Sequence, residues 1–189
     1  MTRDELYRLL DERLEAPAQA AAIEKAIWLA AGRERAVLVA DLSGFTRVTQ
    51  QKGILHFLEG FRRAVALARP VFDRTGAIFW KTAADNLMAS FPRVPEALEA
   101  AAALAATPLD PCDGIHWCLG ISFGRILELE DDLFGDAVNV AYKLGEDVAG
   151  PGEVLVSEPA AACVDGAPLE GPATVTTGGI CLPYYRLRV

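Results

Sequence analysis

Two short strand-like segments lie between two helical ones, and this arrangement constrains the fold more than any other feature of the sequence. The segments AIFWK (residues 77–81) and NLMASF (residues 86–91) are joined by a tight turn that contains AAD. Before them, residues 54–73 repeat apolar side chains at helical spacing. After them, residues 95–106 are alanine-rich with a proline in the first turn. Paired strands between helices are typical of an α+β sandwich with a mostly antiparallel sheet.

The remaining segments extend this order to a split βαβ arrangement of the ferredoxin-like type. Residues 35–41 contain the apolar run AVLVA, which is typical of a central strand. We expect further strands over residues 117–129, 152–158 and 183–189, and a further helix over residues 134–148.

The beginning of the chain predicts an accessory helical arm over residues 1–32, broken near Pro17. One apolar stripe runs along this arm and consists of Leu6, Leu9, Leu10 and Leu14. Such a stripe packs against another surface, and a second chain is one candidate. We expect a single domain over residues 33–189 to follow the arm.

The composition fits one globular domain and argues against several functions. The chain has 189 residues, of which 52% are hydrophobic and 23% charged, as in folded proteins. Its net charge of −8 argues against nonspecific binding to nucleic acid or to acidic membranes. The charged N-terminal segment is unlike a secretory signal, and the soft apolar stretch around Glu99 is too short to span a membrane. A cytoplasmic protein is therefore expected.

The cysteines and histidines give no sign of a zinc site or a disulfide framework. No C-x-x-C pair occurs, and His56 and His116 have no ligand-like spacing. We expect the four cysteines to be reduced and mostly buried; they are Cys112, Cys118, Cys163 and Cys181.

Two aspartates stand where predicted strands end. Asp41 closes the apolar run of the first strand, and Asp85 lies in the hairpin KTAADNLMASF. If these strands are neighbours, both carboxylates meet at one rim of the sheet and suit Mg²⁺ or Mn²⁺, which prefer oxygen ligands. For either aspartate alone, an ordinary turn residue is the simpler interpretation.

A third polar group lies in the segment DDLFGDAVNVAYKLGEDVAGPGEVLVSE. Asn139 and Lys143 are four residues apart and so share one face of the predicted helix, and Asp132 precedes that helix. Taken alone, these residues also fit a solvated helix face.

Together these segments resemble the catalytic domain of class III nucleotidyl cyclases, the adenylate and guanylate cyclase family. The resemblance covers about residues 33–189 and so implies the cyclase-homology-domain architecture. It rests on four segments in the right order and spacing: ADLSGFT, KTAADNLMASF, LGISFGRIL and DLFGDAVNVAYKLGEDVAGPGEVLVS.

The resemblance assigns the metal and phosphate sites to two places. Asp41 and Asp85 match the family's two aspartates, which hold a pair of metal ions, Mg²⁺ or Mn²⁺. The backbone of Gly44, Phe45 and Thr46, at a helix start, would bind phosphates.

The resemblance also implies how the substrate is recognised. Lys81 and Asp132 match the two base-reading positions, and a donor beside an acceptor favours adenine over guanine. For Lys81, the simpler alternative is a strand residue that snorkels at a sheet edge. Asn139 matches the residue that orients the ribose, and Lys143 matches the residue that stabilises the transition state.

Two departures concern residues inside these motifs. Lys143 stands where the family usually has Arg, so the charge is kept but the planar fork is lost, and weaker catalysis is expected. Ala84 stands where the family usually has Gly, which bears on the hairpin turn.

Two further departures concern the end of the domain. The family's late triphosphate-binding Lys is expected near the last hairpin, but Thr176 and Thr177 stand there, and Arg186 or Arg188 are the nearest alternatives. The segment over residues 124–132 is short, so the dimerisation arm of many members is reduced.

The expected function is adenylate cyclase activity, which converts ATP to 3′,5′-cyclic AMP and pyrophosphate in a homodimer whose sites are shared between chains. The alternatives are a guanylate cyclase and a non-catalytic cyclase-like module that binds a nucleotide or a partner in signalling. An unrelated ferredoxin-like binding module would leave the ordered match unexplained.

Overall fold

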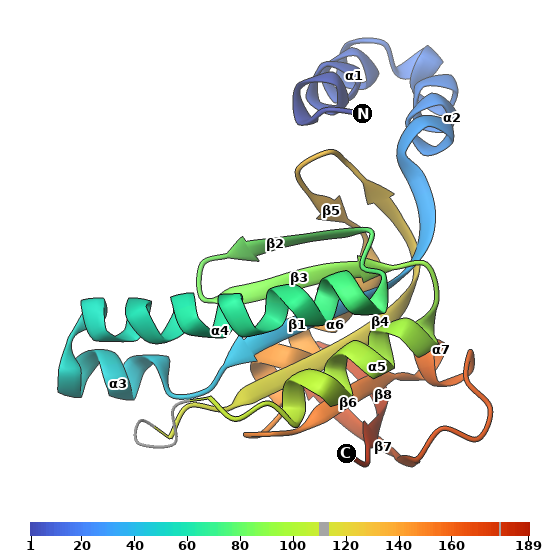
Figure 1. Cartoon of the computed structure of the whole chain (residues 1–189). Helices are drawn as coiled ribbons and strands as arrows, with labels where there is room; N and C mark the ends of the chain where they lie inside the picture. Colours follow the sequence, from blue (N-terminus) through green and yellow to red (C-terminus); the bar gives the residue numbers. More distant parts are fainter. Residues whose placement is uncertain (110–113, 178) are drawn as a thin grey trace.

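One mixed sheet organises the computed structural model of the chain, which describes residues 1–109, 114–177 and 179–189 (Figure 1). Within these residues eight strands form the sheet in the order β2-β3-β1-β4-β6-β8-β7, with β5 paired to β4. All neighbouring strands are antiparallel except β4 and β6. The predicted α+β fold with a mostly antiparallel sheet is therefore confirmed. The strands are β1 (Gly32–Leu42), β2 (Phe79–Ala83), β3 (Asn86–Phe91), β4 (Trp117–Glu128), β5 (Leu133–Phe134), β6 (Val154–Ser157), β7 (Leu169–Thr177) and β8 (Ile180–Leu187).

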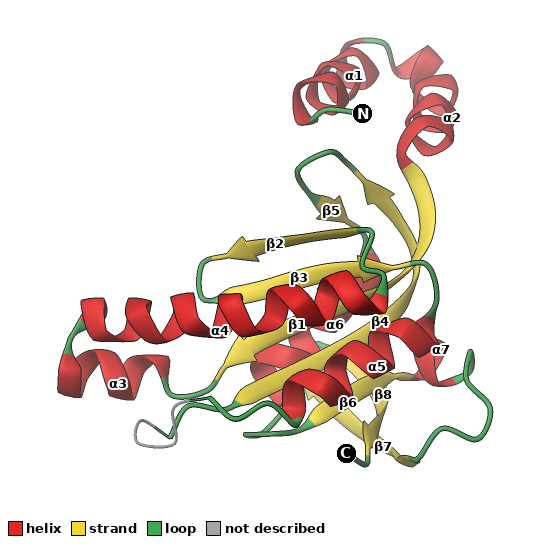
Figure 2. Ribbon diagram, viewed as in Figure 1, coloured by secondary structure: helices red, strands yellow, loops and turns green. Residues whose placement is uncertain are grey.

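Helices cover both faces of this sheet (Figure 2). On one face α4 (Ile54–Thr75) and α5 (Val94–Ala105) bury their apolar sides against alternate residues of β1, such as Leu38. On the other face α6 (Asp136–Tyr142) packs on the intervening residues, such as Val39. Burial on both sides explains the continuous apolar run of β1 and confirms its central place. In the part of the chain that the structure describes, every helix is too short or too polar to cross a membrane.

The predicted hairpin is present, with its first strand two residues further along than expected. Ala83 of β2 pairs with Asn86 of β3, so Ala84 and Asp85 alone form the turn. Ala84 has φ +54°, which is the left-handed region that such hairpin turns usually fill with glycine. The turn therefore forms without the glycine that is usual in the family.

The helix predicted over residues 134–148 begins two residues later than expected, ends at Val148 as expected, and changes type along its length. Phe134 belongs to the short strand β5, because it pairs with Leu127, and Gly135 at φ +151° separates that strand from α6. After α6 the chain continues as a wider π-helix, η2 (Lys143–Val148). The wide turn lets the backbone at Gly145 pass close to the neighbouring strands.

The strand β7 is missing from the predicted order of elements, although its region was expected to form a hairpin with the chain end. It contains Gly171 and Pro172, and its pairing with β8 shifts register between Glu170 and Ala173. Such a strand is tolerated because β7 lies at the edge of the sheet, where a missing N–H donor is harmless.

The N-terminal arm consists of α1 (Arg3–Glu15), the short 3₁₀ turn η1 (Pro17–Gln19) and α2 (Ala20–Ala31), so the predicted break at Pro17 is confirmed. Figure 1 shows the arm at the end of the molecule where β5 lies, away from α4 and α5. One small apolar cluster attaches the arm to the end of β4; its buried members are Leu6, Ile23, Ile27, Ala31 and Leu129. The arm runs into β1 without a loop.

The expectation that the cysteines are mostly buried is wrong for the residues described. Cys118 of β4 is buried, whereas Cys163 and Cys181 are exposed. Cys163 follows the short helix α7 (Glu158–Ala161) at the surface, and Cys181 lies in the outer hairpin of the sheet. Cys112 lies outside the described residues.

Candidate active site

The two aspartates predicted as metal ligands stand at the same end of the sheet. Asp41 is near the end of β1 and lies opposite Cys118 of β4. Asp85 precedes β3, which pairs with the other edge of β1. Because Ala40 pairs with Leu87, the hairpin turn ends beside Asp41. The sheet therefore brings together two carboxylates that are 44 positions apart in the sequence.

At this rim, burial and neighbouring negative charges disfavour the ionised form of Asp41 when no cation is bound. Partial burial raises the pKa of Asp41 to about 6, opposed by a hydrogen bond from the backbone of Leu42 and reinforced by the negative charges of Asp85 and Glu146. Burial also raises the pKa of the neighbouring Cys118 thiol to about 11, with the charge of Asp41 adding to the effect. The thiol is therefore neutral at physiological pH and adds no charge to the rim.

A third carboxylate, Glu146 of η2, approaches this rim and is absent from the sequence-based prediction. The side-chain amide of Asn86 donates a hydrogen bond from Nδ2 to Glu146 Oε1. Burial raises the pKa of Glu146, and the charges of Asp147 and Asp85 act in the same direction. The sequence holds no signal for this contact, because Glu146 reaches Asn86 only through the wide π-helical turn.

The donor set fits a hard divalent cation in its chemistry. Asp41 and Asp85 supply carboxylate oxygens, which are the ligands that Mg²⁺ and Mn²⁺ prefer. Asn86 beside them is only 5% exposed, and its Oδ1 has no hydrogen-bond partner in the described structure. Over residues 1–109, 114–177 and 179–189, no three His, Cys, Asp or Glu side chains are arranged to hold a metal ion. The two aspartates therefore remain the expected ligands, and Glu146 contributes negative charge beside them.

The turn predicted to bind phosphates opens the helix α3 (Phe45–Lys52). Gly44 at φ +92° is its N-cap, and Phe45 packs edge-on against Phe57 of α4 with ring centroids 4.5 Å apart. Ser43 fixes the turn to the chain before β4, because its N–H donates to His116 O at 2.9 Å and its Oγ accepts from His116 N at 3.0 Å. The first amides of α3, including that of the exposed Thr46, are thus presented beside Asp41.

The predicted base-reading residues are in direct contact. Asp132 lies in the loop between β4 and β5, and its Oδ1 is 2.6 Å from Nζ of Lys81 on β2. Burial alone would raise the pKa of Asp132, but the hydrogen bonds from Lys81 and from the Leu133 N–H, with the charges of Lys81 and Arg3, lower it overall. Asp132 is therefore an ionised acceptor beside a cationic donor.

Asn139 and Lys143 line one cavity of about 380 Å³ under α6 and η2. Lys143 Nζ lies 3.3 Å from Asp147 Oδ2, so the cation expected at the transition state is paired with a carboxylate of its own helix. Leu182 of β8 also lines this cavity.

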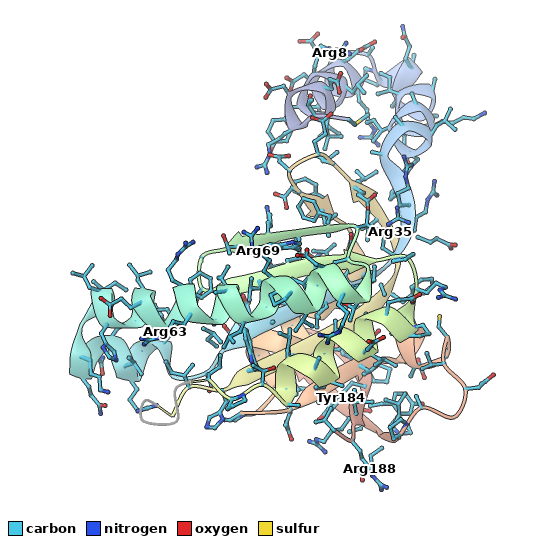
Figure 3. The ribbon with its side chains drawn as sticks, in the orientation of Figure 1. Arg8, Arg35, Arg63, Arg69, Tyr184 and Arg188 are labelled. Carbon is cyan, nitrogen blue, oxygen red and sulfur yellow. The ribbon has the colours of Figure 1, made fainter. Side chains whose placement is uncertain are left out.

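The two arginines considered as replacements for the late Lys are engaged elsewhere. Arg186 Nε lies 2.8 Å from Glu153 Oε1, and Arg188 pairs with Glu170. Figure 3 shows Arg188 near the C-terminus, at the opposite end of the molecule from the arm. Thr176 lies on β7. Because both arginines are paired with glutamates, neither supplies a free cation in place of the late Lys.

Solved structures that are similar to this chain include nucleotidyl cyclase catalytic domains. The crystal structure of an adenylate/guanylate cyclase/hydrolase from Silicibacter pomeroyi matches with a TM-score of 0.66 and 27% identity, over 82% of this chain and 96% of that one. The catalytic core of a rhodopsin-guanylyl cyclase with converted specificity, in complex with ATPαS, matches with a TM-score of 0.68 over 83% of this chain and 98% of that one. At 16% identity, this second likeness concerns the fold alone.

One relative is similar in sequence. "Putative adenylate cyclase 3" of Rhizobium meliloti (strain 1021) is 35% identical over 133 residues, which are 67% of this chain and 22% of the relative. The chain thus spans about a fifth of that protein's length. No protein-family model matches the chain. On the structures and this relative together, the chain belongs to the class III adenylate and guanylate cyclase family.

Proposed function

We propose that the chain is the catalytic domain of an adenylate cyclase, which converts ATP into 3′,5′-cyclic AMP and pyrophosphate. The observation that carries the choice of ATP is the contact between Lys81 and Asp132 at 2.6 Å. Lys only donates hydrogen bonds, and an ionised Asp only accepts them. Adenine offers the complementary edge, with an acceptor at N1 and a donor amine at N6, whereas guanine offers donors at N1 and N2.

In this reaction the ribose 3′-oxygen attacks the α-phosphorus, the hydroxyl proton is lost, and the bond to the pyrophosphate oxygen breaks. Two divalent ions held by Asp41 and Asp85 would acidify the hydroxyl and neutralise the triphosphate. The amides of residues 44–46 bind phosphate oxygens at the start of α3. Asn139 orients the ribose, and the charge of Lys143 offsets the negative charge that develops on the α-phosphate.

We also propose that the active enzyme is a homodimer with sites shared between chains. Asn139 and Lys143 line a cavity beside α6 and η2, and Asp41 and Asp85 stand at the sheet end, so one sequence supplies every residue that a homodimer with shared sites needs. The free thiols of Cys118, Cys163 and Cys181, together with the use of ATP, favour a cytoplasmic setting.

The test is a turnover assay with ATP and with GTP, each with Mg²⁺ and with Mn²⁺, in which cyclic product and pyrophosphate are measured. We expect cyclic AMP from ATP, and we expect Asp41→Asn to lose more than about a hundredfold in kcat, because charge stabilisation supplies most of the catalysis. Asp73→Asn, an exposed carboxylate of α4, is the matched control and should keep full activity. Cyclic GMP as the main product would retain the family and reject the base assignment.

One observation favours a non-catalytic nucleotide-binding module as the second candidate. Lys143, the cation that the reaction needs, is already paired with Asp147. If that pair limits an enzyme, Lys143→Arg should raise kcat, because the guanidinium fork binds phosphate oxygens while keeping its charge. A folded wild-type protein and a folded Lys143→Arg variant that both bind ATP without turnover would favour the second candidate.

A further inference from the structure

The start of the N-terminal arm is attached to the loop that carries Asp132. Met1 O accepts a hydrogen bond from Glu130 N at 3.3 Å. One turn later, Leu6 is buried against Leu129 at the end of β4. A capping box between Thr2 and Glu5 fixes the first turn of α1. The side chain of Arg3, within that turn, is therefore held next to the β4–β5 loop.

Arg3 contacts the base-reading carboxylate directly. Its Nη2 lies 2.7 Å from Asp132 Oδ2 and 3.2 Å from Asp131 Oδ2. Lys81 Nζ and Leu133 N hold the other oxygen, Oδ1 of Asp132, at 2.6 and 2.9 Å. Asp132 thus has a cation on each of its two oxygens, and its side chain is only 16% exposed.

The hydrogen-bonding capacity that remains is small and specific. Each carboxylate oxygen accepts about two hydrogen bonds, so Oδ1 of Asp132 is filled and Oδ2 keeps one free position. The Lys81 ammonium has three protons; one faces Asp132, and another faces Asp131 O at 3.4 Å. One acceptor position and one donor position are left, which is what an adenine N6 amine and N1 require.

The contact that orients Asp132 leaves one donor of Arg3 without a hydrogen bond among the described residues. The Nε of Arg3 is buried and has no hydrogen-bond partner in the described structure. A buried unpaired donor is unfavourable, so the guanidinium orientation is imposed by its surroundings. Without Arg3, only the contacts of Lys81 and Leu133 N with Oδ1 would orient the carboxylate, and Oδ2 of Asp132 would lose its cation.

We propose that Arg3 is a positioning residue for purine recognition, and that the arm is thereby part of the nucleotide site. This inference rests on the proposed function in one respect, the use of Lys81 and Asp132 to bind the base. Arg3 holds the carboxylate so that its one free acceptor position and the free proton of Lys81 face the same ligand edge.

The test compares Arg3→Gln and Arg3→Lys with a matched control on the same helix. Arg8 of α1 pairs with Glu12 at 3.8 Å and lies on the arm as Figure 3 shows, so Arg8→Gln removes one arginine and one surface pair. For each protein we would measure kcat and KM with ATP and GTP, the dissociation constants of both nucleotides by calorimetry, and the thermal midpoint.

We expect Arg3→Gln to raise the KM and dissociation constant of ATP about tenfold, with kcat within about twofold, because one charge-assisted hydrogen bond to the reading residue is lost. The preference for ATP over GTP should fall, and Arg3→Lys should recover part of it. Arg8→Gln should match the wild type. A merely structural role would lower the thermal midpoint and leave the preference unchanged, which would overturn the proposal.

Two other results would also overturn it. A rise in kcat for both nucleotides in Arg3→Gln would make the arm an inhibitory element. Equal binding of ATP and GTP by the wild type, unaffected by Arg3→Gln, would remove the base-reading role. A wild type that makes no cyclic product but binds ATP with a preference that depends on Arg3 would reject the proposed activity and support the role of Arg3.

Discussion

Asp41 has a carboxyl group that folding makes less acidic. Its pKa is raised to about 6 in the folded protein, above the value of about 4 for an unfolded chain. A protonated Asp41 is therefore favoured by folding, and that stabilisation is present below pH 4 and is lost as the pH rises through about 6. Asp41→Asn, which stays neutral, should become more stable than the wild type across this interval.

The measurement is the denaturation midpoint of both proteins from pH 4 to pH 8. The difference should grow between pH 4 and pH 6 and then level off, and added Mn²⁺ should reduce it by stabilising only the wild type. Asp73→Asn separates this effect from the general loss of a negative charge. A difference that is independent of pH would contradict the raised pKa.

Ala84 provides a second prediction at the scale of one residue. A non-glycine residue at φ +54° costs about 1–2 kcal/mol, and glycine avoids that cost. We expect Ala84→Gly to raise the free energy of unfolding by about 1 kcal/mol, as measured by urea denaturation. Ala83→Gly, in the adjacent strand position, should lower it by a similar amount. If both variants are destabilised alike, the turn is not strained by the alanine.

At the scale of elements, the close approach of η2 to the sheet positions Glu146. A Cβ added at Gly120 of β4 would lie 2.2 Å from Ala141 O and 2.4 Å from Gly145 N. Both obstacles are backbone atoms and cannot rotate away. We therefore expect Gly120→Ala to lower the free energy of unfolding by about 3 kcal/mol or more, by overpacking.

Gly124→Ala is the matched control on the same strand. Its added Cβ would meet only the Ala137 side chain, at 3.4 Å, which is an ordinary contact. Chemical denaturation of both variants should show a large loss for Gly120→Ala and a small change for Gly124→Ala. Equal losses would mean that β4 tolerates no added methyl group anywhere, and that the backbone approach is not the cause.

The elements that sequence periodicity predicts well are those that local pattern determines. The buried run of β1, the hairpin of β2 and β3, and the long helix α4 each follow from the spacing of their own apolar residues. The change from α6 to the π-helix η2 does not, because it depends on the glycine contact with β4. Short or irregular strands such as β5 and β7 are missed for the same reason: their partners, and not their composition, make them strands.

Sequence motifs point to most residues of the proposed site, but they give no sign of the contacts between side chains that are distant in the sequence. Asp41, Asp85, Lys81 and Asp132 stand in segments whose order resembles a known family. The contacts of Glu146 with Asn86 and of Arg3 with Asp132 join residues 60 and 129 positions apart. No local pattern encodes such pairs, and a resemblance transfers only the residues that the family shares.

For the whole molecule, the proposed sharing of each site between two chains predicts the activity of mixed variants. Asp41→Asn and Asn139→Ala each damage a different half of the site, so each homodimer should be inactive. Mixing the two should restore about a quarter of wild-type activity, because half of the random dimers are mixed and each of these has one intact site. The control mixture of Asp41→Asn with Asp85→Asn damages the same half twice and should stay inactive. An inactive first mixture, with exchange of subunits verified by sedimentation, would place each site within one chain.

The direct passage from α2 into β1 limits how the arm can move. From Gly32 to Leu42 every residue of β1 is paired with β4, up to the position of Asp41 near its far end. A strand held in this way cannot stretch, and it cannot slip by one residue without turning its buried face outward. Sliding of the arm along the strand axis is therefore forbidden. Only rotation about Gly32 is left, and such a rotation would carry Arg3 away from Asp132 while Asp41 stays in place.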